Sequence, residues 1–240
     1  MGLEQLTEHI FYLPHEPETD RPMLAYVRGE RFSLAVDAGY SAAHVGAFYR
    51  ALSCAGMPEP DFTVLTHWHY DHSFGLHCVH GASFAHWRTN VFLRQECEKA
   101  CCDGYFTALR QQDPFYAREY AAQADPEIVP AGVAFGDGLR FELGGLAADA
   151  FHAEAPHSED CVCIYVPEDG VLFLGDATSE DFFHDGYMDK SKLRMLVERI
   201  ERTDCRYCVL SHAEPLRKAE LLEYLESILE SRSSDSALPL

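Results

Sequence analysis

A histidine-rich segment near residue 70 holds the residue types best suited to metal chemistry. His67, His69, Asp71 and His72 follow directly on the apolar segment 61–66. Neutral imidazole and carboxylate are ligands that suit zinc and related divalent metals. In a loop, the first two histidines fall on one side of the chain while the aspartate and last histidine lie further along, so the spacing predicts two neighbouring metal positions. The alternative, a surface turn without metal, is disfavoured by the position after a strand.

Three apolar runs each end in a residue that could bind a metal. They are 63–66 before His67, 171–175 before Asp176, and 207–211 before His212. Ligands tend to gather just beyond the carboxyl ends of strands, so we expect these three residues to converge. Gly175 would let the backbone approach closely, and a carboxylate at Asp176 between two cations could bridge them.

A further histidine is expected between these runs, where His152 and His157 compete. His157 lies in the loop 153–160, immediately before a strand and a hairpin, which is typical of a ligand position. His152 ends the strand-like segment 146–151, which is typical of a core residue or one that supports a ligand. We therefore favour His157.

The elements that must position these residues can be read from turn and cap signals. Strands are predicted at 10–13, 23–27, 32–36, 61–66, 161–166, 171–174 and 206–210, and helices at 41–55, 74–80, 192–202 and 215–231. Residues 89–124 carry helix formers with a break at Asp113-Pro114, which predicts two helices. Gly-containing turns at 136–138 and 168–170 predict two hairpins. Mixed strands and helices without a linker predict a layered α/β fold, with 1–240 as one domain and 89–124 as a helical insert.

Composition limits the class of protein. The chain has 240 residues and a formal charge of −20, which is the wrong sign for an enzyme that binds nucleic acid backbones. It shows no signal-peptide pattern and no run of 18 apolar residues, so we expect a cytoplasmic protein without a membrane partner. The nine cysteines are spread among apolar segments, which favours buried thiols over a disulfide framework.

Other motifs carry less weight. Cys205 and Cys208 match C-x-x-C but lead into a strand rather than opening a helix, which disfavours a redox role. Cys97, Cys101 and Cys102 are interpreted as helix packing. The sequence lacks G-x-S-x-G, P-loop and G-x-G-x-x-G motifs, so serine hydrolase, NTPase and dinucleotide roles have no basis here.

The order of these residues resembles the metallo-β-lactamase superfamily of metal-dependent hydrolases, from about residue 10 to 228. The resemblance rests on H-x-H-x-D-H at His67, His69, Asp71 and His72, then His157 in Ala-Pro-His-Ser, Asp176 in Leu-Gly-Asp and His212 in Leu-Ser-His. It implies a four-layer αβ/βα sandwich. One metal would take His67, His69 and His157, the other Asp71, His72 and His212, and Asp176 would bridge them.

Within that superfamily, the ligand set is similar to the glyoxalase II and lactonase branches. The best-known zinc β-lactamases carry Cys at the position of Asp176, and di-iron flavoproteins commonly carry Glu at that of His69. The nuclease branch has large extra domains for which this chain has no room. The resemblance therefore disfavours hydrolysis of β-lactams, reduction of oxygen or nitric oxide, and nuclease activity.

The expected reaction is hydrolysis of an ester, thioester, lactone or amide of a small molecule. Two divalent ions, zinc in the first place with iron or manganese as alternatives, would hold a bridging hydroxide as nucleophile. Asp71 is the candidate for proton handling. A small-molecule phosphodiesterase and a non-catalytic metal-binding or sensing protein are the alternatives. Lys190, near the site in sequence, could attract an anionic substrate or could be a solvated residue, and the oligomeric state is open.

Overall fold

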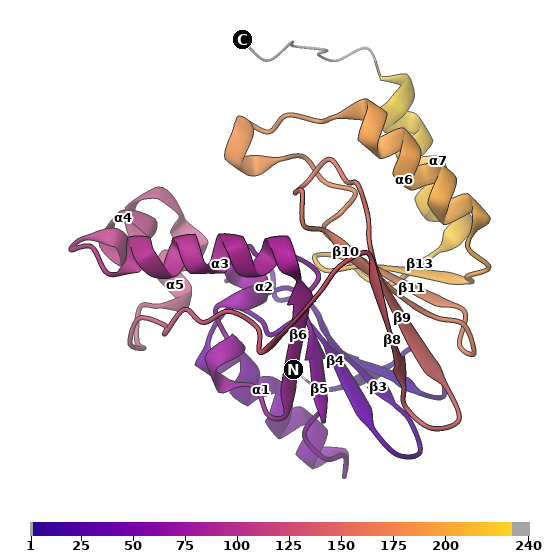
Figure 1. Ribbon diagram of the computed structural model, residues 1–240, viewed down its shortest axis with the longest axis horizontal. Helices are drawn as coiled ribbons and strands as arrows, with labels where there is room; N and C mark the ends of the chain where they lie inside the picture. The colour runs from indigo at the N-terminus through magenta and orange to yellow at the C-terminus, as the bar shows by residue number, and fades with distance from the viewer. Residues whose placement is uncertain (1, 232–240) are drawn as a thin grey trace.

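Two β-sheets packed face to face, with helices on both outer sides, form the computed structural model, which describes residues 2–231 (Figure 1). The first sheet has seven strands and the second has six. Helix, sheet, sheet and helix follow one another as four layers. The αβ/βα sandwich expected from the sequence is therefore confirmed.

The first sheet comes from the first half of the chain. Its strands, in spatial order, are β1 (Glu4–Gln5), β2 (Ile10–Leu13), β3 (Leu24–Arg28), β4 (Ser33–Val36), β5 (Phe62–Val64), β6 (Ala82–His86) and β7 (Val133–Phe135). The pairs from β1 to β4 are antiparallel, and those from β4 to β7 are parallel. The histidine-rich loop therefore leaves the carboxyl end of a strand inside the sheet.

The second sheet comes from the second half of the chain. Its strands, in spatial order, are β13 (Leu216–Arg217), β12 (Tyr207–Leu210), β11 (Val171–Gly175), β10 (Val162–Val166), β9 (Ala147–His152) and β8 (Gly138–Glu142). Only β11 and β12 pair in parallel. Their carboxyl ends consequently point the same way, which brings Asp176 and His212 to one edge.

Helices cover the outer faces of both sheets (Figure 1). The helical segments are α1 (Ala42–Cys54), α2 (Tyr70–Ser73), η1 (Leu76–Cys78), α3 (Trp87–Ala100), α4 (Tyr105–Gln112), α5 (Pro114–Glu119), η2 (Phe182–His184), α6 (Lys190–Arg202) and α7 (Lys218–Glu230). Helices α6 and α7 pack on the second sheet, and the others except η2 lie on the side of the first. Among residues 2–231, no helix combines the length and the apolar character that crossing a membrane requires.

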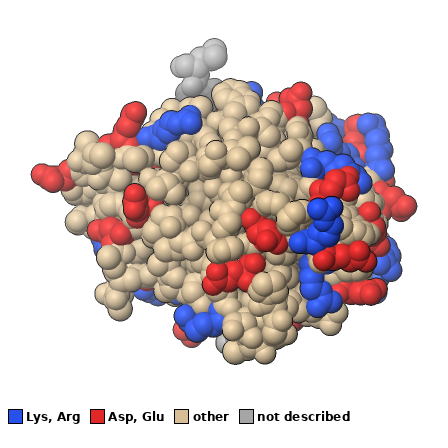
Figure 2. Space-filling model, turned by 60° about the horizontal axis from the view of Figure 1, so that its bottom comes forward, with Lys and Arg blue, Asp and Glu red and all other residues tan. Residues whose placement is uncertain are grey.

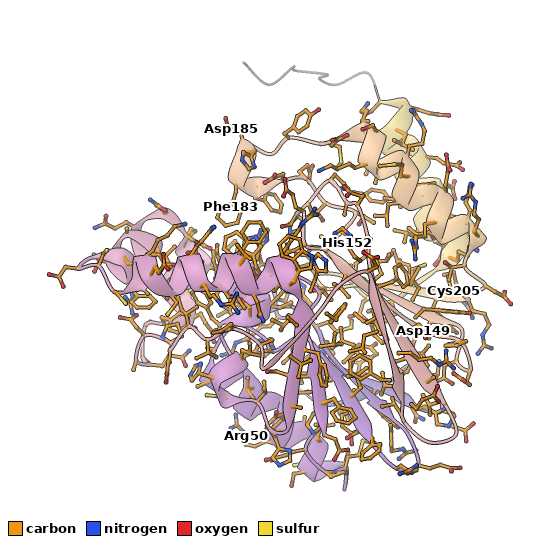
Figure 3. All side chains as sticks on the ribbon, viewed as in Figure 1. Arg50, Asp149, His152, Phe183, Asp185 and Cys205 are labelled. Carbon is orange, nitrogen blue, oxygen red and sulfur yellow. The ribbon has the colours of Figure 1, made fainter. Side chains whose placement is uncertain are left out.

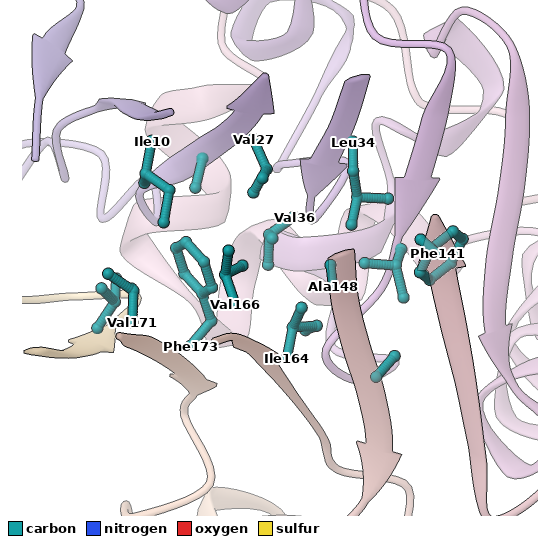
Figure 4. Close-up of a cluster of buried hydrophobic side chains, with 14 of the residues drawn as sticks. Ile10, Val27, Leu34, Val36, Phe141, Ala148, Ile164, Val166, Val171 and Phe173 are labelled. Atoms are coloured by element: carbon teal, nitrogen blue, oxygen red, sulfur yellow. The ribbon is translucent and has the colours of Figure 1, made fainter. Parts of the chain in front are cut away.

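The core between the sheets follows from alternation along the strands. In β10, Val162, Ile164 and Val166 face the first sheet, while Cys163 and Tyr165 face α6 and α7. Figure 4 shows side chains of both sheets meeting in this core. Successive side chains of a strand point to opposite faces, so a strand covered on both faces is apolar throughout. This explains the unbroken apolar runs that precede the site residues.

Local signals predicted several elements correctly. Helix α1 begins after Ser41, whose side chain accepts a hydrogen bond from the backbone of His44. The turn before β11 joins β10 and β11 as an antiparallel hairpin, with Gly170 at φ +60°. Helix α6 begins at Lys190 rather than residue 192, because Asp189 caps it. These features depend on residues close together in the chain, so the sequence alone reveals them.

The structure differs from the predicted elements in several places. Residues 136–138 do not form a hairpin turn, because β7 pairs with β6 in the first sheet and β8 with β9 in the second. Strand β6 was not predicted, and it lies between β5 and β7. The segment expected to hold two helices holds three, because a second break falls at Gly104, where φ is +91°. The single-domain assignment stays a prediction.

One buried histidine of α1 lies outside the histidine-rich loop. His44 is 1% exposed, and its Nδ1 accepts a hydrogen bond from the backbone N of Tyr40 at 3.2 Å. Burial, with a smaller contribution from the positive charge of Arg21, lowers the pKa of His44 to about 3. A Cβ at Gly39 would lie 2.7 Å from the same Nδ1, so glycine is required beside it. The fold therefore holds this imidazole neutral.

This burial predicts a loss of stability in acid. Below the ordinary histidine pKa of about 6.5 the unfolded chain binds a proton that the folded His44 excludes, so the free energy of unfolding should fall as pH drops from 6.5 toward 3. His44→Gln should make that fall shallower by up to about 1.4 kcal/mol per pH unit. Denaturant unfolding between pH 7 and pH 4.5 measures the slope. Val45→Ala, which removes buried volume without a titratable group, should shift the curve and keep its slope. Parallel curves for wild type and His44→Gln would contradict the prediction.

Candidate metal centre

Three histidines form the first cluster at the edge where the two sheets meet. His67 and His69 follow β5, and His157 lies in the loop between β9 and β10. The Nε2 atom of His157 lies 3.2 Å from Nε2 of His67 and 3.0 Å from Nδ1 of His69. All three side chains are buried. Nitrogen atoms 90 residues apart in the chain therefore converge on one point.

These distances fit a tetrahedral metal site. A zinc ion with Zn–N distances of about 2.0–2.1 Å holds its ligand atoms about 3.3 Å from one another. Burial, with the neighbouring imidazole of His72, keeps the pKa of His67 well below its ordinary value. Burial, with His157 beside it, lowers the pKa of His69 in the same way. Ring nitrogens of His67, His69 and His157 point toward one another here, an arrangement that a cation would stabilise.

Two carboxylates and two histidines form the second cluster. Oδ2 of Asp71 lies 3.1 Å from Nε2 of His72 and 3.2 Å from Nε2 of His212. Oδ2 of Asp176 lies 3.2 Å and 3.3 Å from the same two nitrogen atoms. Two imidazole nitrogens and two carboxylate oxygens therefore surround one position, which could hold a second ion.

Asp176 connects the two clusters. Its Oδ2 atom is also 3.8 Å from Nε2 of His157, a member of the first cluster. The preceding Gly175 has φ +57°, and a Cβ there would lie 2.8 Å from Cβ of Thr66. Glycine at this position lets β11 approach the histidine-rich loop closely, as the sequence suggested. The position of this carboxylate suits a ligand shared by two ions.

Charge is balanced inside the second cluster. Burial alone would raise the pKa of Asp71, but His72 and His212 hold it well below the ordinary value. Burial alone would lower the pKa of His72, but the carboxylates of Asp71 and Asp176 hold it well above that value. Metal ligands must be deprotonated to bind, so a cation at this point would replace the imidazole protons.

Outer hydrogen bonds orient the two histidines nearest the first sheet. Nδ1 of His72 donates to Oδ2 of Asp37 at 2.8 Å, so Nε2 is the nitrogen that a cation at the second cluster would meet. Nδ1 of His67 lies 3.1 Å from the hydroxyl oxygen of Thr66, and that hydroxyl donates to Asp37. A partner on one ring nitrogen fixes the tautomer and the direction of the other. Asp37 thus supports one histidine of each cluster.

The histidines from the second sheet have outer partners as well. Nδ1 of His157 donates to the backbone oxygen of Glu180 at 2.7 Å. Nδ1 of His212 donates to Oδ1 of Asp20 at 3.1 Å. In both residues, Nε2 is then the nitrogen that faces its cluster.

The structure brings together all seven residues named from the sequence, whereas His152 lies apart from them. The ring of His152 stacks on that of His86 at 4.3 Å and 13°, and its Nε2 donates to the backbone oxygen of Glu159 at 2.9 Å. The sequence reasoning missed Asp37, Thr66 and Asp20. Asp37 directly follows the apolar strand β4, so the same pattern of a polar residue after an apolar run could have found it.

Two cavities open beside the clusters. The larger, of about 630 Å³, is lined by Asp71, Asp176 and His212 together with residues of α4 and α5. The smaller, of about 420 Å³, is lined mainly by aromatic and polar residues around Trp68 and Phe92. His69, His157 and Phe183 line both. The first cluster is therefore reached from two sides.

Phe183 forms the partition between these cavities. Its ring lies 5.0 Å from that of Trp68 and 4.8 Å from that of His69, and it is 54% exposed. Figure 3 shows Phe183 on the side of its turn that faces α3, with Asp185 at the outer end. An exposed aromatic ring beside a metal ligand is well placed to contact a bound molecule.

The helical insert and the segment around Lys190 differ in what they contribute to the cavities. The helical insert supplies Leu109, Gln112 and Phe115 to the larger cavity. Lys190 lines neither cavity, because its ammonium donates to the backbone oxygen of Ser231. The lysine that lines the smaller cavity is Lys192.

Comparisons with known proteins identify a family and a fold. A family model described as the metallo-beta-lactamase superfamily matches residues 25–212. A metallo-beta-lactamase from Pontibacter korlensis aligns with 16% identity and a TM-score of 0.64, covering 96% of this chain and 99% of that one. The DIM-1 metallo-beta-lactamase aligns with 17% identity and a TM-score of 0.65, covering 95% and 96%.

A double mutant of the sec-alkyl sulfatase PisA1 is also similar, with 15% identity and a TM-score of 0.71. It covers 95% of this chain and 41% of that one. A search of curated protein sequences finds no match. At these identities the solved structures support the fold alone.

Proposed function

Because this chain belongs to the metallo-beta-lactamase superfamily, we propose that it is a dinuclear metal-dependent hydrolase. His67, His69 and His157 would hold one divalent cation. Asp71, His72 and His212 would hold the other, and Asp176 would bridge them. The observation that carries the proposal is the meeting of these two clusters at the shared carboxylate, which is 3.8 Å from the first and 3.2–3.3 Å from the second.

The donor atoms favour particular metals. The first cluster consists of imidazole nitrogens and the second of imidazole nitrogens and carboxylate oxygens, and neither contains a thiolate. This set suits zinc first, and iron or manganese as alternatives. We propose the cytoplasm as the location of the protein.

The ions, when bound, would activate a water molecule near neutral pH and polarise the bond to be cleaved. The protein's own residues would handle protons and substrate. Oδ1 of Asp71 has no hydrogen-bond partner among the described residues, and the carboxylate lines the larger cavity, so it could accept the proton of the attacking water. Phe183 would pack against the bound molecule and limit the access of bulk water.

The substrate we propose is a small ester, thioester, lactone or amide. Cavities of about 630 and 420 Å³ are within the range of small-molecule sites. On the face shown in Figure 2, Lys and Arg side chains lie among Asp and Glu rather than forming a continuous basic surface. This distribution and the charge of −20 disfavour a nucleic acid substrate. A small-molecule phosphodiester is the second candidate, since a pair of ions can clamp a phosphoryl group equally well.

A substrate panel and elemental analysis test the proposal together. Protein purified without chelator should carry close to two divalent ions per chain. It should turn over at least one ester, thioester, lactone, amide or phosphodiester in its zinc, manganese or iron form, and chelation should abolish that turnover. Protein that stays metal-free under these conditions would contradict the dinuclear site. Metal-loaded protein that cleaves nothing in the panel would favour the binding or sensing alternative.

The two lysines near the site should differ in their effect on an anionic substrate. Lys192→Met should raise KM by up to about 5-fold and nearly keep kcat, because an exposed charge pair contributes at most about 1 kcal/mol of uniform binding. Lys190→Met should leave KM unchanged, because its ammonium is engaged by the backbone of Ser231 outside both cavities. Steady-state kinetics of the two metal-loaded variants measures this. A rise in KM for Lys190→Met alone would reverse the assignment.

A further inference from the structure

The loop between β2 and β3 places an aspartate directly behind a residue of the second cluster. Oδ1 of Asp20 lies 3.1 Å from Nδ1 of His212 and 3.0 Å from Nε2 of His15. The other nitrogen of His212, Nε2, is the one that faces Asp71 and Asp176. His212 therefore lies between Asp20 on one side and the two carboxylates on the other.

The same loop has a backbone conformation that must be maintained by its surroundings. Asp20 has φ +55°, a left-handed conformation that is uncommon outside glycine. Arg21 binds Glu119 of α5 through two hydrogen bonds, Nε to Oε2 at 2.8 Å and Nη2 to Oε1 at 3.0 Å. Strained backbone is retained where the surrounding contacts over-determine it, and it often marks a functional site.

A second contact ties the loop to the segment that follows β12 and contains His212. The backbone N of Met23 donates to the carbonyl of Ser211 at 2.7 Å. The rings of His15 and His212 also meet edge to face at 5.2 Å. Asp20 is thus held at a fixed distance from His212 by contacts on both sides of it in the chain.

The protonation of the His212 ring decides whether His15, Asp20 and His212 form a metal site or a hydrogen-bonded support. His15, Asp20 and His212 lie close enough together to hold an ion by themselves. However, a histidine that binds a cation through Nε2 keeps its proton on Nδ1, and that proton needs an acceptor. Nδ1 of His212 can then only donate. The group consequently acts as a hydrogen-bonded support rather than a third metal centre.

We propose that Asp20 is a positioning residue for the second metal position. Its Oδ1 accepts the Nδ1 proton of His212, and this bond fixes the tautomer and the direction in which Nε2 faces Asp71 and Asp176. His15 donates to the same oxygen and steadies the carboxylate, while Arg21 and Glu119 hold the loop. The inference rests on the proposed dinuclear site, and it adds a residue 192 positions away in the sequence from the ligand it orients.

Zinc affinity is the direct test. The zinc-loaded full-length protein is titrated with a chromophoric chelator, and two release steps give two dissociation constants. Asp20→Ala should weaken one of the two by about 10- to 100-fold, the usual cost of losing an outer partner of a metal ligand, and leave the other unchanged. Asp20→Asn should weaken zinc binding much less than Asp20→Ala. An amide oxygen can accept the same proton, and Asn tolerates the left-handed backbone.

Asp185→Ala is the matched control. Asp185 also has a positive φ, of +57°, and the substitution removes the same charge, but its side chain lines neither cavity. Both zinc affinities should stay at the wild-type values. The melting temperature of each variant without zinc reports whether the fold itself has changed, so that a loss of folding is not mistaken for a loss of positioning.

The outcomes are separable. Wild-type protein that binds fewer than two zinc ions contradicts the proposed function, and the inference falls with it. Wild-type protein with two zinc ions and an Asp20→Ala variant with both affinities unchanged overturns the inference alone. An Asp20→Asn variant that folds but binds zinc as weakly as Asp20→Ala also overturns the inference alone. A wild-type protein with three ions, one of them lost in Asp20→Ala, would show a third metal centre instead.

Discussion

Replacing His69 by alanine should abolish turnover. The first cluster has three imidazoles, and Nδ1 of His69 lies 3.0 Å from Nε2 of His157, so its loss leaves the first ion only two histidine ligands beside the bridging Asp176. Loss of an outer partner costs about 10- to 100-fold in metal affinity or activity, and loss of a ligand itself should exceed that. The measurements are kcat/KM on a substrate found in the panel and metal content, which should fall by close to one ion per chain.

The matched control for this variant is the double substitution Cys205→Ser/Cys208→Ser. The two sulfur atoms are 3.9 Å apart in the core between the second sheet and α6 and α7, and neither cysteine lines a cavity. Figure 3 shows Cys205 on the side of α6 and α7, away from Phe183. Turnover should stay near wild type if the variant is folded. An active His69→Ala protein with an inactive double-serine protein would support a redox role for the C-x-x-C pair.

The second large effect is expected on stability, at the ion pair between Arg21 and Glu119. The carboxylate of Glu119 is fully buried and also accepts hydrogen bonds from Ser41 and Gln123. Arg21→Met removes the partner and leaves a buried charge, which costs about 3–5 kcal/mol of the free energy of unfolding. Denaturant unfolding of the wild type and the variant measures it.

Two comparisons make that result specific. The double substitution Arg21→Met/Glu119→Met should lower the free energy of unfolding less than Arg21→Met alone, because it leaves no unpaired charge. Arg140→Ala breaks an exposed pair with Asp149 on β9 and should cost no more than about 1 kcal/mol. An Arg21→Met variant as mild as Arg140→Ala would mean that water reaches Glu119 and satisfies it.

Sequence reasoning succeeded where one short segment carries the information. The spacing of His67, His69, Asp71 and His72 predicted that these side chains divide between two neighbouring positions, and the structure places them in two neighbouring clusters. The apolar runs before Asp176 and His212 indicated strands, and the parallel pairing of β11 and β12 brings their ends together. The residue types that meet at this edge could therefore be predicted before their arrangement was known.

It failed where partners distant in the chain decide the structure. Gly136 and Gly138 carry the same turn signal as the hairpin at 168–170, but β7 finds its partner in β6, so the chain crosses between sheets there. Strand β6 is short and only partly buried, and its neighbours β5 and β7 define it. Asp20 acts on His212 across 192 residues, and no local pattern reports such a contact.

Each cluster takes ligands from both halves of the sandwich. The histidine-rich loop belongs to the first sheet, whereas His157, Asp176 and His212 belong to the second. An ion in the first cluster would join positions 90 residues apart, and one in the second would join positions 104 residues apart. Such cross-links restrict the unfolded chain most when the loop they close is long. The pair of ions would then cross-link the two sheets at the edge that carries the clusters, and a shortage of metal would lower the stability of the fold as well as any activity.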